Sequence, residues 1–312
     1  MSETNPYLHS VRTSPGIRLS VLFGSFFVLL LITSVISAGI NSLSIGDERD
    51  QALLSAFLQC VLAFCIPAVL LARFCSKEWI NWLKLSSKPT IRALCGVVIV
   101  YLLSLPAMEW LIVWNSNLHL PESMSSLEQL LRSWEETSES TSEMLLDAHG
   151  IIPVLFGVLV IGVVTGFSEE LFFRGGLQGI FRGANIGVTG SVWLAAFIFS
   201  FMHFQFFGFL PRLFMGAFFG YLLIWTRSIW VPVFAHILNN SIVVITSAIK
   251  GNATSSILNQ GNSDIYFGNN LIVTGSVILT LMFLWICKDK FFQSRQTRKR
   301  WPESQLPPVS EK

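Results

Sequence analysis

The chain has 312 residues, of which 52% are hydrophobic and only 13% are charged. Soluble domains carry about 25% charged residues, so this composition excludes an ordinary soluble domain and indicates a protein of the lipid bilayer. The formal net charge of +2 is too small to indicate a nucleic-acid partner.

Apolar segments long enough to cross a bilayer recur along the chain, since a membrane helix needs about 20 mostly apolar residues. They predict transmembrane helices over 19–40, 51–72, 91–113, 151–173, 188–207, 211–226, 229–249 and 269–287. The fourth of these helices has an alternative end at residue 182. We therefore expect an all-α membrane protein, a polytopic bundle of about eight transmembrane helices.

These helices and their loops divide the chain into segments. The divisions are an N-terminal tail (1–18), three transmembrane helices (19–113), an acidic loop with an amphipathic helix (114–150), a four-helix core (151–249), a polar loop (250–268), the last transmembrane helix (269–287) and a basic tail (288–312). Within the acidic loop, leucines and Trp134 recur at helical spacing. That helix is expected to be a solvated cap over the bundle or a lid that gates access to it.

The distribution of basic residues predicts the orientation. Lysines and arginines gather in both tails and in the loops after the second, fourth and sixth helices. With both termini in the cytoplasm, these groups all fall on the cytoplasmic side, as the positive-inside rule expects, and the 114–150 loop is extracytoplasmic. The residues that depart from this pattern are Arg49, Arg132, Arg212 and Lys250.

Charged groups within a membrane helix are costly, so the sequence Ser168-Glu169-Glu170-Leu171-Phe172-Phe173-Arg174 is a candidate functional site. Glu170 and Arg174 are four residues apart on one helical face, which favours a structural ion pair. Glu169 points about 100° away and has no such partner, so it is the candidate reactive carboxylate. The alternative is that both glutamates are surface charges at the end of the helix.

Two histidine motifs lie in later predicted helices. Phe199 precedes His203 by four residues in the fifth helix, and His236 precedes Asn240 by four residues in the seventh. Each pair shares one helical face. Taken singly, His203 is also consistent with hydrogen-bonded packing, and the His236–Asn240 pair with polar contacts between helices.

The predicted hairpin of the fourth and fifth helices, which turns over 183–187, would place Glu169 and His203 at similar depth. That requires the fourth helix to continue to the turn. His236 and Asn240 begin closer to their own turn, so a tilted helix or a funnel-shaped cavity is needed to bring them to the same place. In the sixth helix, Gly216 and Gly220 form a Gly-x-x-x-Gly pair, which predicts close packing between the motif helices.

The three motifs, in this order, resemble those of the CPBP family of intramembrane proteases, which includes type II CAAX prenyl endopeptidases and bacteriocin-processing or immunity relatives. The family pattern is Glu-Glu-x-x-x-Arg, Phe-x-x-x-His and His-x-x-x-Asn. All three are intact here, within about residues 151–249. The motif positions are Glu169, Glu170, Arg174, Phe199, His203, His236 and Asn240.

The resemblance implies an intramembrane endopeptidase that cuts a membrane-associated peptide or protein, in an integral protein of the bacterial inner membrane. Glu169 and His203 would activate the attacking water, while His236 and Asn240 would stabilise the oxyanion. Glu170, Arg174 and Phe199 would support the site. A carboxylate removed from water is a strong base, and fixed amide and imidazole donors suit an oxyanion.

Cofactor use and rival functions stay open at this stage. No cofactor is favoured, because the sequence lacks the His-Glu-x-x-His spacing of common zinc proteases. Zinc is the alternative, with Glu169, His203 and His236 as its ligands. Rival functions are a non-catalytic membrane scaffold or bacteriocin-immunity protein, and a transporter whose buried charges mark an ion path.

Overall fold

The computed structural model describes residues 13–44, 46–184, 186–250 and 270–292. This part of the chain contains helices and turns but no β-strand. The predicted N-terminal tail up to residue 12, the polar loop from 251 to 268 and the basic tail beyond residue 292 lie outside the described residues.

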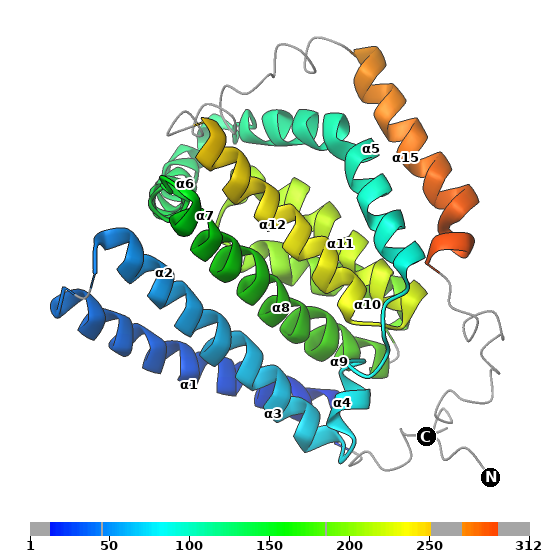
Figure 1. Cartoon of the computed structure of the whole chain (residues 1–312), viewed down its shortest axis with the longest axis horizontal. Coiled ribbons are helices and arrows are strands. Elements are labelled where there is room, and N and C mark those ends of the chain that lie inside the picture. Colours follow the sequence, from blue (N-terminus) through cyan, green and yellow to red (C-terminus); the bar gives the residue numbers. More distant parts are fainter. Residues whose placement is uncertain (1–12, 45, 185, 251–269, 293–312) are drawn as a thin grey trace.

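Most of the helices are long and apolar. Among the described residues, six helices have the length and composition to cross a membrane: Pro15–Ser42, Glu48–Cys75, Ile91–Ser116, Ile151–Gly183, Phe206–Thr226 and Trp230–Ile249. Two shorter apolar helices are Gly187–Phe201 and Asn270–Ile286. The predicted class is therefore confirmed: the described chain is an all-α, polytopic membrane protein, with its helices arranged as in Figure 1.

Several of these helices are built from named pieces. Before the core, the pieces are α1 (Pro15–Ser42), α2 (Glu48–Leu58), η1 (Gln59–Cys65), α3 (Ile66–Cys75), α4 (Trp79–Trp82), α5 (Ile91–Ser116), η2 (Glu122–Met124) and α6 (Ser125–Leu146). After them come α7 (Ile151–Gly157), η3 (Val158–Val164), α8 (Thr165–Glu170), η4 (Leu171–Leu177), α9 (Gln178–Gly183), α10 (Gly187–Phe201), η5 (Phe206–Gly208), α11 (Phe209–Thr226), α12 (Trp230–Lys250) and α15 (Asn270–Phe291).

The central helix, α7 to α9, contains two π-helical stretches, η3 and η4, that flank α8 on either side. π-helical turns are rare and occur frequently at functional sites. The helix continues to Gly183, which confirms the longer of the two predicted ends. It therefore reaches the turn before α10, as the predicted hairpin required.

A row of glycines lets the central helix approach α12. A Cβ added at Gly157, Gly162 or Gly166 would meet α12 side chains or backbone, and at Gly166 it would lie 3.2 Å from the backbone nitrogen of Ile237. The first two glycines are five residues apart, and the wider η3 turn between them keeps both on the α12 side. This close approach positions α12 beside α8.

Helix α5 is bent (Figure 1), and Pro106 lies inside it. Proline removes one backbone hydrogen bond of a helix and distorts the next turn. Here Ser276 of α15 enters the gap: its hydroxyl donates to the Leu103 carbonyl at 2.5 Å and accepts from the Ala107 N–H at 3.3 Å. Helix α15 thus packs on α5 and provides hydrogen-bond partners for the backbone groups beside Pro106.

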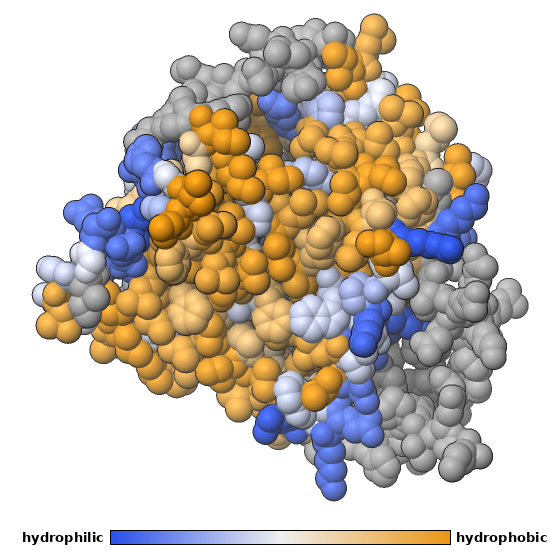
Figure 2. Space-filling model, viewed as in Figure 1, coloured by the Kyte–Doolittle hydropathy of each residue, from blue (hydrophilic) through white to orange (hydrophobic). Residues whose placement is uncertain are grey.

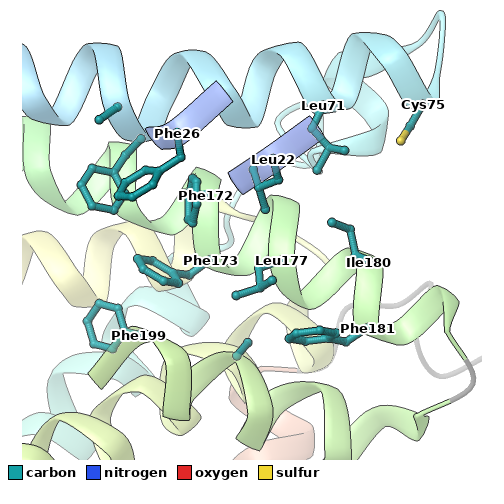
Figure 3. Close-up of a cluster of buried hydrophobic side chains, with 13 residues drawn as sticks. Leu22, Phe26, Leu71, Cys75, Phe172, Phe173, Leu177, Ile180, Phe181 and Phe199 are labelled. Carbon is teal, nitrogen blue, oxygen red and sulfur yellow. The ribbon is translucent and has the colours of Figure 1, made fainter. Parts of the chain in front are cut away.

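The largest core cluster joins α1, α3, the central helix and α10 (Figure 3). Phe172 and Phe173 follow Glu170 directly and are 0% and 1% exposed. The Phe172 ring lies 5.4 Å from the Phe64 ring, and the Phe173 ring lies 5.1 Å from the Phe199 ring. Aromatic packing therefore fixes the rotation of the helix that presents both glutamates.

Hydrophobic side chains cover most of the face shown in Figure 2, and hydrophilic residues gather toward its edges. Many large apolar side chains are exposed, including Val35 at 74% and Ile151 at 79%. Such a surface is expected where helices face lipid rather than water.

One predicted helix is wrong in its extent. The fifth was expected over 188–207, but α10 ends at Phe201 and residues 202–205 form a turn before η5. Phe204 adopts a left-handed backbone with φ 54, which ends a helix. His203 therefore lies on a turn at the end of α10 and not within a transmembrane helix.

Helix α6 lies within the 114–150 segment, where an amphipathic helix was expected. It packs on the 202–208 turn, with the Trp134 ring 5.8 Å from that of Phe204 and 6.1 Å from that of Phe206. Glu135 accepts a hydrogen bond from the Phe207 N–H at 3.1 Å. The helix thus covers the turn that carries His203.

Candidate functional site

Glu170 is the centre of a closed cluster, which we define as Glu170, Arg174 and His236. Its Oε1 accepts from Arg174 Nη1 at 2.6 Å and from His236 Nδ1 at 2.8 Å. The three side chains are 0%, 1% and 4% exposed. The predicted ion pair between Glu170 and Arg174 is thus present, and His236 joins it from α12.

Arg174 also ties the central helix to α11 and α10. Its Nη2 donates to the Gly216 carbonyl at 3.0 Å, and its guanidinium lies 4.5 Å from the centre of the Phe199 ring. One turn later, Gln178 Nε2 donates to the Gly220 carbonyl at 3.2 Å. A Cβ at either glycine would crowd these helices, so the Gly-x-x-x-Gly pair makes the predicted close packing.

Glu169 lies beside the closed cluster and differs from Glu170 in its contacts. Its Oε2 has no hydrogen-bond partner, although the atom is buried, and it lies 3.8 Å from His236 Nε2. The side chain is 12% exposed, against 0% for Glu170. Oε2 of Glu170 is unpartnered too, but its Oε1 has two donors, whereas no hydrogen bond to Glu169 is found among the described residues.

The two imidazoles are fixed in orientation by their Nδ1 atoms. Nδ1 of His236 lies on a carboxylate, so it carries a proton and turns Nε2 toward Glu169. Nδ1 of His203 lies 2.8 Å from the Phe199 carbonyl, which can only accept, so Nε2 of His203 is left for other partners. The Phe199 ring lies 4.9 Å from His203 and 5.9 Å from His236.

His236 reaches the depth of the two glutamates, although its place near the start of α12 made this uncertain from sequence. The close approach at Gly166 brings Ile237, and with it His236, level with α8. Asn240 lies one turn further along α12, partly exposed, and its Nδ2 donates to the Ile161 carbonyl in η3 at 3.0 Å. Among the described residues it makes no hydrogen bond to the other predicted site residues.

Arg212 belongs to this neighbourhood, although the sequence identified it only as an exception to the charge pattern. It lies in the first turns of α11, close enough to interact electrostatically with Glu169 and His203. A basic residue within an apolar helix, on the wrong side for the positive-inside rule, was the signal that could have marked it.

The side chains considered for zinc do not form a ligand set. No group of three or more His, Cys, Asp or Glu residues is placed to hold a metal ion in the part of the chain that the structure describes. Nδ1 of His236 is instead hydrogen-bonded to Glu170. We therefore derive no chemical step through a metal.

The fold and the cluster define a class: a polytopic, all-helical membrane protein whose bundle encloses paired glutamates, two histidines and an arginine. Residues 151–242 match the family described as Rce1-like, type II CAAX prenyl endopeptidase Rce1-like. The chain thus carries an Rce1-like domain, which confirms the family resemblance seen in the three motifs. The matched stretch holds every residue of those motifs.

Two curated relatives match a similar share of the chain. The protein named "Putative membrane peptidase YdiL" of Bacillus subtilis (strain 168) is 31% identical over 121 residues, which is 38% of this chain and 48% of that protein. The "Membrane-embedded CAAX protease MroQ" of Staphylococcus aureus (strain USA300) is 29% identical over 134 residues, 41% of this chain and 53% of that protein. The chain therefore spans about half the length of these relatives. No solved structure matches it.

Proposed function

We propose that the chain is an intramembrane endopeptidase that hydrolyses a peptide bond of a membrane-associated peptide or protein. The observation that carries this proposal is that Glu169, beside His236 in a membrane-spanning helix, accepts no hydrogen bond from the described residues although its Oε2 is buried. An unsatisfied buried carboxylate oxygen costs free energy, so its retention is typical of a functional group. The Rce1-like domain and the names of both relatives support the same reaction class.

In the proposed reaction, Glu169 is the general base and His203 helps to hold the water. The water oxygen bonds to the peptide carbonyl carbon as its proton passes to Glu169. When the carbon–nitrogen bond breaks, the same proton passes to the leaving nitrogen. Nε2 of His203 is free to orient the water because its Nδ1 is bound to the Phe199 carbonyl.

Asn240 and His236 are the proposed stabilisers of the oxyanion. The Asn240 amide has two N–H groups, and only one is used by the Ile161 carbonyl. His236 presents Nε2 on the side of Glu169, where it can donate once the imidazole is protonated. Glu170 and Arg174 support this geometry through Nδ1 of His236.

We propose a metal-free, glutamate-type reaction, with zinc as the alternative. The substrate is proposed to be a peptide associated with the bilayer, either prenylated or unmodified. We also propose that both termini lie in the cytoplasm of a bacterial cell and that the helices span its inner membrane. The distribution of basic residues supports this orientation.

The test uses the full chain reconstituted in lipid vesicles, with internally quenched peptides that end in a CAAX sequence, with and without a prenyl group. We expect cleavage that persists with a chelator and is lost in Glu169→Gln. Loss of activity on chelation, restored by zinc, would establish the metal-dependent alternative. Cleavage by the Glu169→Gln variant at the wild-type rate would refute Glu169 as the base.

A further inference from the structure

Arg212 binds the turn that carries His203. Its Nη1 donates to the Gln205 main-chain carbonyl at 3.0 Å, and its Nη2 donates to Gln205 Oε1. Both acceptors belong to one residue, so the planar guanidinium binds the turn through two of its N–H donors at once. Gln205 lies two residues after His203, in the turn between α10 and η5.

Three further residues, one each from α5, α10 and α6, hold this turn and the start of α11. Asn115 of α5 donates to the Phe206 carbonyl at 3.3 Å and accepts from the Leu210 N–H at 2.8 Å. Ser200 of α10 donates to the Phe209 carbonyl at 2.7 Å. Glu135 of α6 accepts from the Phe207 N–H. Arg212 is the cationic member of this set and the one that reaches the residue nearest His203.

The charge of Arg212 is within electrostatic range of two carboxylates. It interacts electrostatically with Glu135 of the covering helix α6 and with Glu169 of the site. His203 lies within range of the same charge. A guanidinium among apolar groups is stabilised by such carboxylates.

We propose that Arg212 is a positioning residue of the proposed protease site: its two hydrogen bonds to Gln205 fix the turn that presents His203, and its positive charge is within electrostatic range of Glu169. This inference rests on the proposed function. It links α6, which contacts the turn through Glu135 and Trp134, to the placement of the two groups that handle the water. The arginine acts through His203 and Glu169 and does not itself touch the reacting atoms.

The first test compares kinetic constants on the quenched CAAX peptides. Arg212→Ala should lower kcat by about 100-fold with little change in KM, because a misplaced catalytic group slows the chemical step more than binding. Arg212→Lys keeps the charge but not the two-pronged grip, and it should recover about tenfold of that loss. Gln205→Ala should be milder, and the Arg212→Ala/Gln205→Ala double variant should equal Arg212→Ala alone.

Arg132→Ala is the matched control. This arginine lies over the Phe207 ring of the same turn, at 4.0 Å, but its charge-assisted hydrogen bonds go to Glu128. Its kcat should stay near the wild-type value. An unchanged kcat in Arg212→Ala, a loss confined to KM, or an equal loss in Arg132→Ala would overturn the proposal.

A second measurement separates this inference from the proposed function. Hydrogen–deuterium exchange of the amides of residues 202–208 should be faster in Arg212→Ala than in Arg132→Ala or wild type, because the turn has lost its two donors. Unchanged exchange overturns the grip on the turn, whether or not cleavage is observed. Absence of cleavage by the wild-type chain would defeat the proposed function, while the exchange result still decides the role of Arg212 in the turn.

Discussion

Two adjacent glutamates divide the site into regions of different character. Glu170 lies in the closed cluster, 0% exposed, with an arginine and a histidine on one oxygen. Glu169 is 12% exposed and accepts no hydrogen bond from the described residues; together with the partly exposed His203 and Asn240 it forms what we call the more exposed side of the site. One residue step around a helix therefore separates a group that holds the structure from a group that is free to react.

The largest expected effect tests the closed cluster. Arg174→Ala leaves Glu170 buried without its cation, which costs about 3–5 kcal/mol when one partner of a buried pair is removed. The free energy of unfolding, measured by SDS titration in mixed micelles, should fall by that amount.

Arg182→Ala is the matched control, because Arg182 is an exposed arginine at the end of the same helix. It should change the free energy of unfolding by less than about 0.5 kcal/mol. Equal losses in the two variants would remove the distinction between the closed cluster and an ordinary surface charge.

The second effect tests the more exposed side through His203. His203→Ala should lower kcat by about 10²–10⁴-fold, the usual contribution of a positioned acid or base. Its unfolding free energy should stay close to that of wild type, because the side chain is partly exposed on a turn. The exposed His149 of the 114–150 loop supplies the control His149→Ala, which should cleave normally. A His203→Ala variant that is destabilised but fully active would show that His203 supports the structure and not the reaction.

A third prediction concerns the packing that surrounds the closed cluster. Gly220→Ala would place a Cβ 2.9 Å from Gln178 Oε1 and 2.9 Å from a Val192 methyl group. Overpacking of this kind costs about 1–3 kcal/mol. In Gly24→Ala of α1 nothing lies within 4 Å of the new Cβ, so that variant should be neutral or gain up to about 1 kcal/mol. Unfolding titrations of the two variants check the difference, and equal stabilities would contradict it.

The smallest effect is a pH dependence in the covering segment, outside the membrane. Hydrogen bonds from Arg132 and His119 and from the Leu120 N–H lower the pKa of Glu128 from 4.5 to about 2. Because the folded pKa is lowered, the stabilisation is present above pH 4.5 and is lost as the pH falls toward 2. Wild type should therefore melt above Glu128→Gln at pH 7, and this margin should shrink through that acid range. A margin that grows on acidification would contradict the assignment.

Local features of the fold and site were predictable from sequence, and non-local ones were not. The membrane helices follow from apolar length, and the Glu170–Arg174 pair follows from helical spacing. The end of α10 was predicted wrongly, since residues from α5, α6 and α11 hold the 202–208 turn and apolar length cannot reveal them.

The same limit explains why the positions of Arg212 and His236 in the site could not be predicted from the sequence. The depth of His236 depends on the glycine contacts of α8 with α12, and on a π-helical stretch that spacing rules do not anticipate. Arg212 departed from the charge pattern, but its partner Gln205 was predicted to lie inside a helix. The positions of both residues depend on contacts with segments that are distant in sequence.

The most direct test of the central claim compares the membrane peptides of cells that produce wild type with those of cells that produce Glu169→Gln at equal levels. The two side chains have nearly the same shape, so the variant removes the ionisable oxygen and keeps the packing. The control is Glu143→Gln, in an exposed residue of α6. We predict cleavage products in wild type and Glu143→Gln that are absent in Glu169→Gln. The same products in all three samples would contradict the account. Products in none of the samples would also contradict it, and this is the result that a membrane scaffold or immunity protein predicts.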